Sequence, residues 1–125
     1  MIKLWERVFP DAPPDNNPAK DIKIKREVQP ELFLVAIDED MLVGTVMGGF
    51  DGHRGWVYYL GVDPVHQRRG IGTALMKQVE SKLLNRGCPK LNLQIRIDNQ
   101  DVQAFYENLG YITEDRVSMG KKNNR

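Results

Sequence analysis

The sequence is poor in the residues that build disulfide frameworks and metal centres. Its 125 residues include one cysteine, Cys88, and two histidines, so no disulfide can form within the chain. A single thiol is typical of a reducing compartment and favours a cytoplasmic location. No clustered ligand spacing and no Ser-His-Asp arrangement stands out, so we expect no metal site. Cys88 is interpreted as a small buried thiol.

Excess charge and long apolar runs are missing as well. The 18 basic and 17 acidic residues give a formal net charge of +1, without the strongly basic face of a nucleic-acid-binding protein. No apolar run approaches the ~20 residues that a membrane-spanning helix needs, and the first residues lack a signal-peptide core. We therefore expect one soluble domain over residues 1–125 that binds neither nucleic acid nor membrane.

Hydrophobic patterning is what the sequence does have. It predicts a short helix over residues 2–9, a proline-rich loop, and a mixed α/β (α+β) sheet with helices packed against it. The expected strands and helices after that loop follow the order strand 32–37, strand 42–49, strand 56–62, helix 71–86, strand 91–97, helix 99–109 and strand 111–121.

Two of these segments define the centre of the sheet. Strand 56–62, WVYYLGV, is apolar on both faces and is therefore predicted to be central. A strand, a helix and a second strand span residues 56–97, so a right-handed crossover should make the two strands parallel. Leu91, Leu93, Ile95 and Ile97 are expected to share one face of the second strand.

The segment between that central strand and its helix, HQRRGIGT, has the composition of an anion site. The first turn of a helix has unpaired backbone N–H groups and a partial positive charge, and Gly70 and Gly72 let a phosphate approach closely. The dinucleotide fingerprint fails because Leu75 stands where its third glycine belongs, and the Walker loop fails because no lysine precedes Thr73. A pyrophosphate site and a simple tight turn both remain open.

Three motifs in order resemble those of the GNAT superfamily of N-acetyltransferases. They are QRRGIG at 67–72, YYLGVDP at 58–64 and DNQDVQAFYENLGY at 98–111, and the resemblance covers about residues 32–117. The run GTVMGGFDGHRG is similar to the YpeA-like branch. The resemblance implies a mostly antiparallel mixed sheet with helices on both faces, whose central parallel strands splay apart to admit acetyl-coenzyme A.

The resemblance also implies a set of residues that bind acetyl-CoA. Backbone amides of the glycine loop would hold its pyrophosphate, and the strand end would pair with its pantetheine arm. A backbone N–H near Val62 would hold the acetyl carbonyl and stabilise the oxyanion. The implied binding residues are Gln67, Arg68, Arg69, Gly70, Ile71, Gly72 and Thr73 in the loop, Leu60, Gly61 and Val62 on the strand, and Asn99 beyond it.

The remaining implied roles concern catalysis. Tyr106 would be the general acid that protonates the departing thiolate, as an alternative to simple core packing. Asn99 fits a helix N-cap as well as a pantetheine contact. The reaction implied is direct attack by a primary amine of a small molecule or peptide.

Two departures from the family pattern stand out. Strand residues 56–60 carry no carboxylate to act as general base, while His53, Asp51 and Asp63 are interpreted as turn or surface residues. A coenzyme-A-binding module with little catalysis is therefore the alternative function. The family's first strand is also missing, which leaves strand 32–37 as an exposed edge and suggests either a homodimer or a shortened chain.

Overall fold

The computed structural model describes residues 4–5, 18–66, 70–95 and 97–122. Contacts divide the chain into two units, residues 1–94 and 95–125. The single domain remains a prediction. The elements are α2 (Pro18–Glu27), η1 (Pro30–Leu32), β1 (Phe33–Asp38), β2 (Met41–Phe50), β3 (Gly55–Val62), η2 (Pro64–His66), α3 (Ile71–Asn85), β4 (Leu91–Leu93) and α4 (Gln100–Asn108).

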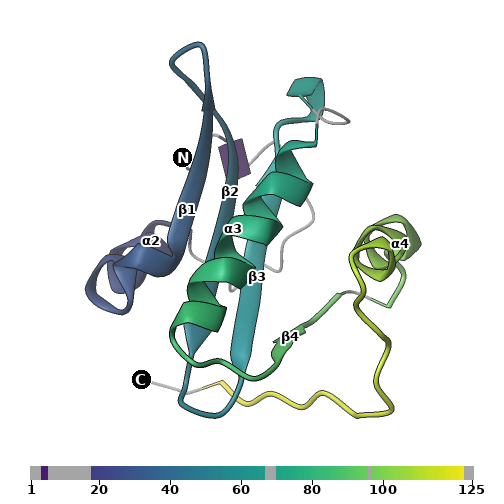
Figure 1. Cartoon of the computed structure of the whole chain (residues 1–125). Helices are drawn as coiled ribbons and strands as arrows, with labels where there is room; N and C mark the ends of the chain where they lie inside the picture. Colours follow the sequence, from purple (N-terminus) through teal and green to yellow (C-terminus); the bar gives the residue numbers. More distant parts are fainter. Residues whose placement is uncertain (1–3, 6–17, 67–69, 96, 123–125) are drawn as a thin grey trace. The chain divides into compact units, whose positions relative to one another are not determined.

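The sheet has the strand order β1-β2-β3-β4 (Figure 1). The pairs β1–β2 and β2–β3 are antiparallel, and β3 and β4 are parallel. This confirms the mixed, mostly antiparallel sheet and the interior position of β3. Glu39 and Asp40, which join β1 to β2, have φ angles of 50° and 65°, as the tight turn of a two-residue hairpin requires.

Helix α3 covers one face of the sheet, packing on β2 and β3 (Figure 1). Leu75, Val79 and Leu83 of its predicted stripe are buried. The helix approaches the sheet closely because β2 has glycines beneath it. A Cβ atom at Gly48 would lie only 2.6 Å from Val79 Cγ2, and one at Gly44 would lie 3.0 Å from Leu75 Cδ1. These glycines therefore set the distance between α3 and the sheet.

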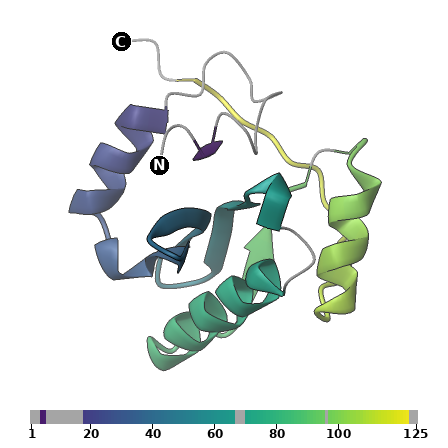
Figure 2. The same cartoon turned by 90° about the horizontal axis from the view of Figure 1, so that it is seen from above.

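Segments from the N-terminal part of the chain cover the opposite face of the sheet (Figure 2). Leu4 and Trp5 are helical and buried, and they form a cluster with Met47. The Trp5 ring also stacks on Tyr59, with centroids 4.2 Å apart. Helices therefore lie on both faces of the sheet, as predicted, although the rest of the expected helix 2–9 falls outside the described residues.

Three details of the predicted fold were wrong. The strand expected over 91–97 ends at Leu93, and Ile97 is 97% exposed in a turn instead of sharing a buried face. The described residues 111–122 contain no strand, and Ile112 and Val117 are 84% and 88% exposed, so their apolar side chains line no buried face there. On β3, Trp56 and Tyr58 are 37% and 44% exposed, so this strand is not buried on both sides.

Candidate functional site

Strand β3 carries a bulge at Tyr59 and Leu60. Thr45 pairs with Gly61 and Met47 pairs with Tyr58, so two residues of β3 face one residue of β2. Tyr59 has a φ angle of 54°, in the left-handed region that side chains rarely adopt. A non-glycine residue there costs on the order of 1–3 kcal/mol and persists only where its surroundings enforce it.

A chain of hydrogen bonds holds this bulge. The indole N–H of Trp5 donates to the Thr45 hydroxyl oxygen at 2.8 Å, and the Thr45 hydroxyl donates to the Tyr59 carbonyl at 3.0 Å. Thr45 is completely buried. The bulge is therefore tied to β2 and to the helical residues 4–5.

The bulge lies where the parallel pair separates. Strand β4 pairs with Gly55–Val57 alone, whereas β3 continues to Val62. Bulges bend a strand and increase its local twist, which moves the strand end away from its neighbour. Leu60, Gly61 and Val62, the predicted pantetheine-binding residues, all lie on this part of β3, beyond its last pair with β4.

The glycine segment begins α3 as expected. Gly70 is the N-cap, with a φ angle of 76°, and its carbonyl accepts the first helical hydrogen bond from Ala74 N at 2.9 Å. Ile71, Gly72 and Thr73 therefore direct their amides out of the first turn, away from the intrahelical ladder. Among the described residues, none beyond its own chain neighbours and helix backbone has an atom within 4 Å of a Cβ built on Gly70. Gln67, Arg68 and Arg69 lie outside the described residues.

The strand end and the helix start meet at Gly44 of β2. A Cβ on Gly44 would lie 3.2 Å from Ile71 Cγ2 and 3.3 Å from the Gly61 carbonyl oxygen. The structure thus brings the predicted residues of β3 and of the first turn of α3 to one place.

The connection between these two segments is fixed by Asp63. This residue was interpreted as a turn or surface residue, and it lies in a turn but is only 4% exposed. Its carboxylate accepts from Val65 N at 3.1 Å, and its carbonyl accepts from His66 N at 2.8 Å, which together set the turn η2. His66 in turn lies 3.7 Å from the Asp38 carboxylate.

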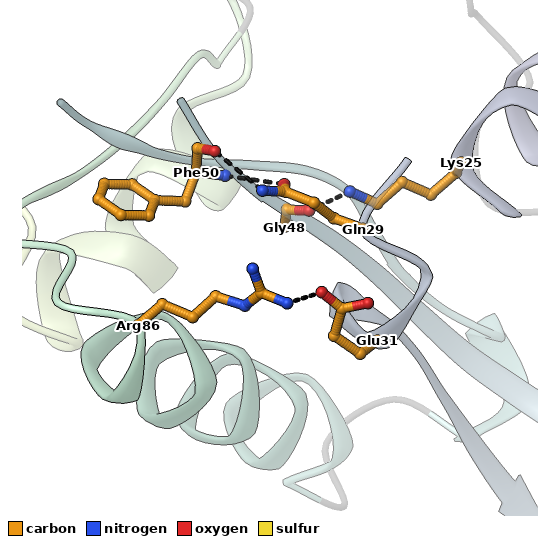
Figure 3. A network of polar contacts seen from close by, with 6 residues as sticks. All are labelled: Lys25, Gln29, Glu31, Gly48, Phe50 and Arg86. Carbon is orange, nitrogen blue, oxygen red and sulfur yellow. Dashed lines mark hydrogen bonds and ion pairs between the residues drawn. The ribbon is translucent and has the colours of Figure 1, made fainter. Parts of the chain in front are cut away.

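Helix α2 is fastened to the far end of β2 by polar contacts (Figure 3). Gln29 bonds Phe50 twice, donating to its carbonyl at 2.9 Å and accepting from its N–H at 3.0 Å. The Lys25 ammonium donates to the Gly48 carbonyl. Burial, and secondarily the charge of Arg86, lower the pKa of Lys25. Arg86 of the α3 C-cap pairs with Glu31 of η1 (Figure 3).

This attachment brings a carboxylate to the bulge. The Tyr59 hydroxyl donates to Asp21 Oδ2 at 2.6 Å. Burial raises the pKa of the Tyr59 phenol, and the hydrogen bond and charge of Asp21 raise it further. No signal in the sequence pointed to Asp21, because it lies 38 residues from its partner. Thr45, a polar residue within the apolar strand LVGTVMGG, was a signal that could have been recognised.

Tyr106 and Asn99 belong to the second unit. Asn99 is the N-cap of α4, and its side chain accepts from Val102 N at 3.3 Å, which confirms the capping interpretation. Tyr106 is 7% exposed and its ring contacts Phe105 and Tyr111 edge to face, at 5.1 and 5.5 Å. Burial raises the pKa of the Tyr106 phenol, so the group keeps its proton at neutral pH.

Two further findings concern the described part of the chain. It contains no group of three or more histidine, cysteine or acidic residues that could hold a metal ion. None of its helices is both long enough and apolar enough to cross a membrane. The single thiol, Cys88, is 3% exposed, as expected of a small buried residue.

Comparison with known proteins identifies the family of this chain. The acetyltransferase (GNAT) family matches residues 1–111. An acetyltransferase from Yersinia pestis (strain Pestoides F) is 49% identical over 122 residues, which cover 98% of this chain and 86% of the relative. The chain belongs to the acetyltransferase (GNAT) family.

Solved structures share the fold. Ard1 from Thermoplasma volcanium has a TM-score of 0.76 at 23% identity, over 90% of this chain and 78% of its own. AAC(6')-Iy, solved in complex with the bisubstrate analog CoA-S-monomethyl-acetylneamine, has a TM-score of 0.74 at 17% identity, over 98% and 92% of the two chains.

The hydrogen-bond chain at the bulge can be tested through Thr45. Thr45→Val removes its hydroxyl, and with it the bonds to Trp5 and Tyr59, at nearly constant shape. We expect the free energy of unfolding, measured with urea, to fall by about 1–3 kcal/mol, because the buried indole N–H loses its acceptor. Thr45→Ser should retain most of the stability. Thr113→Val, at an exposed hydroxyl, is the control, and an equal effect of both valine variants would contradict the assignment.

Proposed function

We propose that the protein transfers the acetyl group of acetyl-CoA to a primary amine of a small molecule or peptide, by direct attack in a ternary complex. The observation that carries this proposal is the junction at Gly44, where Gly61 of β3 and Ile71 of α3 lie against the same residue. A ligand with an anionic group and an extended arm fits that junction.

The pyrophosphate would bind at the first turn of α3. The amides of Gly70, Ile71, Gly72 and Thr73 supply the donors, with Gln67, Arg68 and Arg69 preceding them in sequence. The helix dipole adds positive potential there. The open space around the Gly70 Cα supports this reading, since no neighbouring atom fills the place of a side chain.

The pantetheine arm would lie along the last residues of β3. Strand β3 extends past β4 from Tyr58 to Val62, so an extended chain can align with the backbone of Leu60, Gly61 and Val62. In this position an amide near Val62 stabilises the oxyanion of the tetrahedral intermediate. Asn99, whose side chain caps α4, contacts the same arm in this proposal.

The chemistry requires one acid and one proton acceptor. The amine nitrogen attacks the thioester carbonyl carbon, the carbon–sulfur bond breaks, and the thiolate takes the hydroxyl proton of Tyr106. The proton of the amine passes to water, and solvent reprotonates Tyr106. A phenol carries its proton at neutral pH, so Tyr106 enters the reaction in the form that can donate.

The alternative is a module that binds coenzyme A without turnover. It is favoured by the absence of a carboxylate among strand residues 56–60. The complex of AAC(6')-Iy with a CoA-linked acetylneamine supports the enzyme for a protein of the same fold. Measured turnover on an amine panel distinguishes the two functions.

Acetyl-CoA binding is tested at Gly70. Gly70→Asp places an anion and a side chain at the proposed pyrophosphate site, so we expect calorimetry to show affinity for acetyl-CoA reduced at least ~100-fold by charge repulsion. Gly87→Asp is a matched control, because Gly87 also has a positive φ, of 83°, and equally open surroundings, but follows the C-terminus of α3. No heat with the unmodified protein, or equal losses in both variants, would contradict the proposed site.

Catalysis is tested at Tyr106. Tyr106→Phe removes the proton donor, so we expect kcat to fall by about 100-fold, within the usual range for a general acid, while the affinity for acetyl-CoA is unchanged. Release of free thiol measures the rate. Tyr111→Phe removes a neighbouring phenol and serves as control. Full activity of Tyr106→Phe would exclude this residue as the acid.

Self-association is tested at β1, an edge strand of the described sheet. Val35 and Ile37 on β1 are 41% and 67% exposed, and an edge of this kind can pair with a second copy. We expect light scattering to give twice the 14.3 kDa mass of one chain, and Ile37→Lys to restore the monomer. Leu84→Lys, at an exposed position of α3, should leave the dimer intact. A monomer at high concentration would exclude the dimer.

A further inference from the structure

The structure supplies a carboxylate next to the bulge that the sequence of β3 does not contain. Asp21, on α2, accepts a 2.6 Å hydrogen bond from the Tyr59 hydroxyl. Tyr59 immediately precedes Leu60–Val62, the segment proposed to hold the thioester arm. The Asp21 carboxylate therefore lies at the tip of the Tyr59 side chain, on the face of the sheet opposite α3.

That face is the one from which an acceptor can approach. On the other face of the sheet, α3 packs against β2 and β3 through Leu75, Val79 and Leu83, each of which is at most 5% exposed. On the side of α2, the half-exposed rings of Trp56 and Tyr58 remain accessible to solvent. An amine that reaches the bulge from this side meets the Asp21 carboxylate.

Two other acidic residues adjoin β3, one at each end of the strand, and both are engaged elsewhere. The Asp63 carboxylate is buried in its own turn, where it accepts from Val65 N. The Asp51 carboxylate accepts from the backbone of His53 and Arg54 in the β2–β3 turn, and these bonds lower its pKa. Asp21 is half-buried and held by one phenol, so it retains acceptor capacity toward a ligand.

The environment of Asp21 is suited to a cation. Its charge raises the pKa of Tyr58 and of Tyr59, although burial is the larger cause for both, so the two phenols stay neutral donors. Lys25, one helical turn further along α2, lies 5.9 Å from the Tyr58 ring centroid while its ammonium is directed at the Gly48 carbonyl. The Tyr58 ring therefore already faces one ammonium group, and aromatic faces attract such groups.

We propose that Asp21, oriented by Tyr59, binds the ammonium group of the acceptor. The charge selects aliphatic amines without a carboxylate next to the amine, such as diamines and peptide α-amines, over free amino acids. Asp21 is an acceptor-binding residue in this scheme, and Tyr59 is a positioning residue. The inference rests on the proposed acetyl transfer and names the substrate class for the same site.

The test uses amino acids paired with their decarboxylated amines, such as lysine with 1,5-diaminopentane. We expect the unmodified protein to prefer the amine of each pair. Asp21→Asn keeps an acceptor for Tyr59 but removes the charge, so KM for 1,5-diaminopentane should rise about tenfold, a change of the size that one partly screened ion pair gives. The preference over lysine should fall by a similar factor, and acetyl-CoA affinity should not change. Glu27→Gln, at an exposed carboxylate of the same helix, should alter neither value.

The outcomes separate this inference from the proposed function. Absence of acetyl-CoA binding would overturn the proposed function itself. Acetyl-CoA turnover with unchanged KM and unchanged preference in Asp21→Asn would overturn the role of Asp21 alone, as would a preference for amino acids. Acetyl-CoA binding without turnover on any pair would also overturn it. Should Asp21→Asn fail to fold, Tyr59→Phe is measured, and an unaltered KM for 1,5-diaminopentane in that variant would exclude the proposed positioning.

Discussion

The left-handed backbone of Tyr59 is the constraint on which the arrangement of this protein depends. The residue is held in that conformation from three directions, by the Thr45 hydroxyl on its carbonyl, the Trp5 ring against its own, and the Asp21 carboxylate on its hydroxyl. Because these partners come from three distant segments, the bulge cannot relax without disturbing both the sheet and the helices over it. The parallel pairing with β4 ends at Val57, two residues before the bulge.

The glycines of β2 are the second feature on which the arrangement depends, because they let α3 approach the sheet. With Gly44 and Gly48 beneath it, α3 lies close enough for its first turn to reach the end of β3. A site built from backbone amides needs this proximity more than it needs particular side chains, since the donors belong to every residue. The positive φ of Gly70 then directs the start of the helix. Close packing of an apolar core and the geometry of a polar site are thus determined by the same small residues.

How far the sequence predicted this site depends on whether the relevant signal is local. The helix over 71–86 and the Asn99 cap follow from neighbouring residues and were confirmed. The strand expected after Tyr111 failed, because alternation of a few apolar residues does not provide a partner strand. The bulge at Tyr59 and its contact with Asp21 are products of tertiary packing, and no spacing rule links residues 38 positions apart. The splaying of the parallel pair was implied by resemblance, and the strand register shows the short parallel pairing of β3 and β4.

In the proposed site, the backbone binds the coenzyme and side chains select the acceptor. A coenzyme site of main-chain amides, as proposed, would tolerate wide sequence change, because every residue supplies an amide. Selection among acceptors requires charged and aromatic side chains, and α2 is the described element that brings a charged one to the bulge. Because Gln29 and Lys25 fix α2 to β2 independently of the glycine segment, substitutions on its inner face can change the acceptor while the proposed coenzyme site is preserved. Asp21 lies on that inner face, where it contacts the hydroxyl of Tyr59 at the bulge.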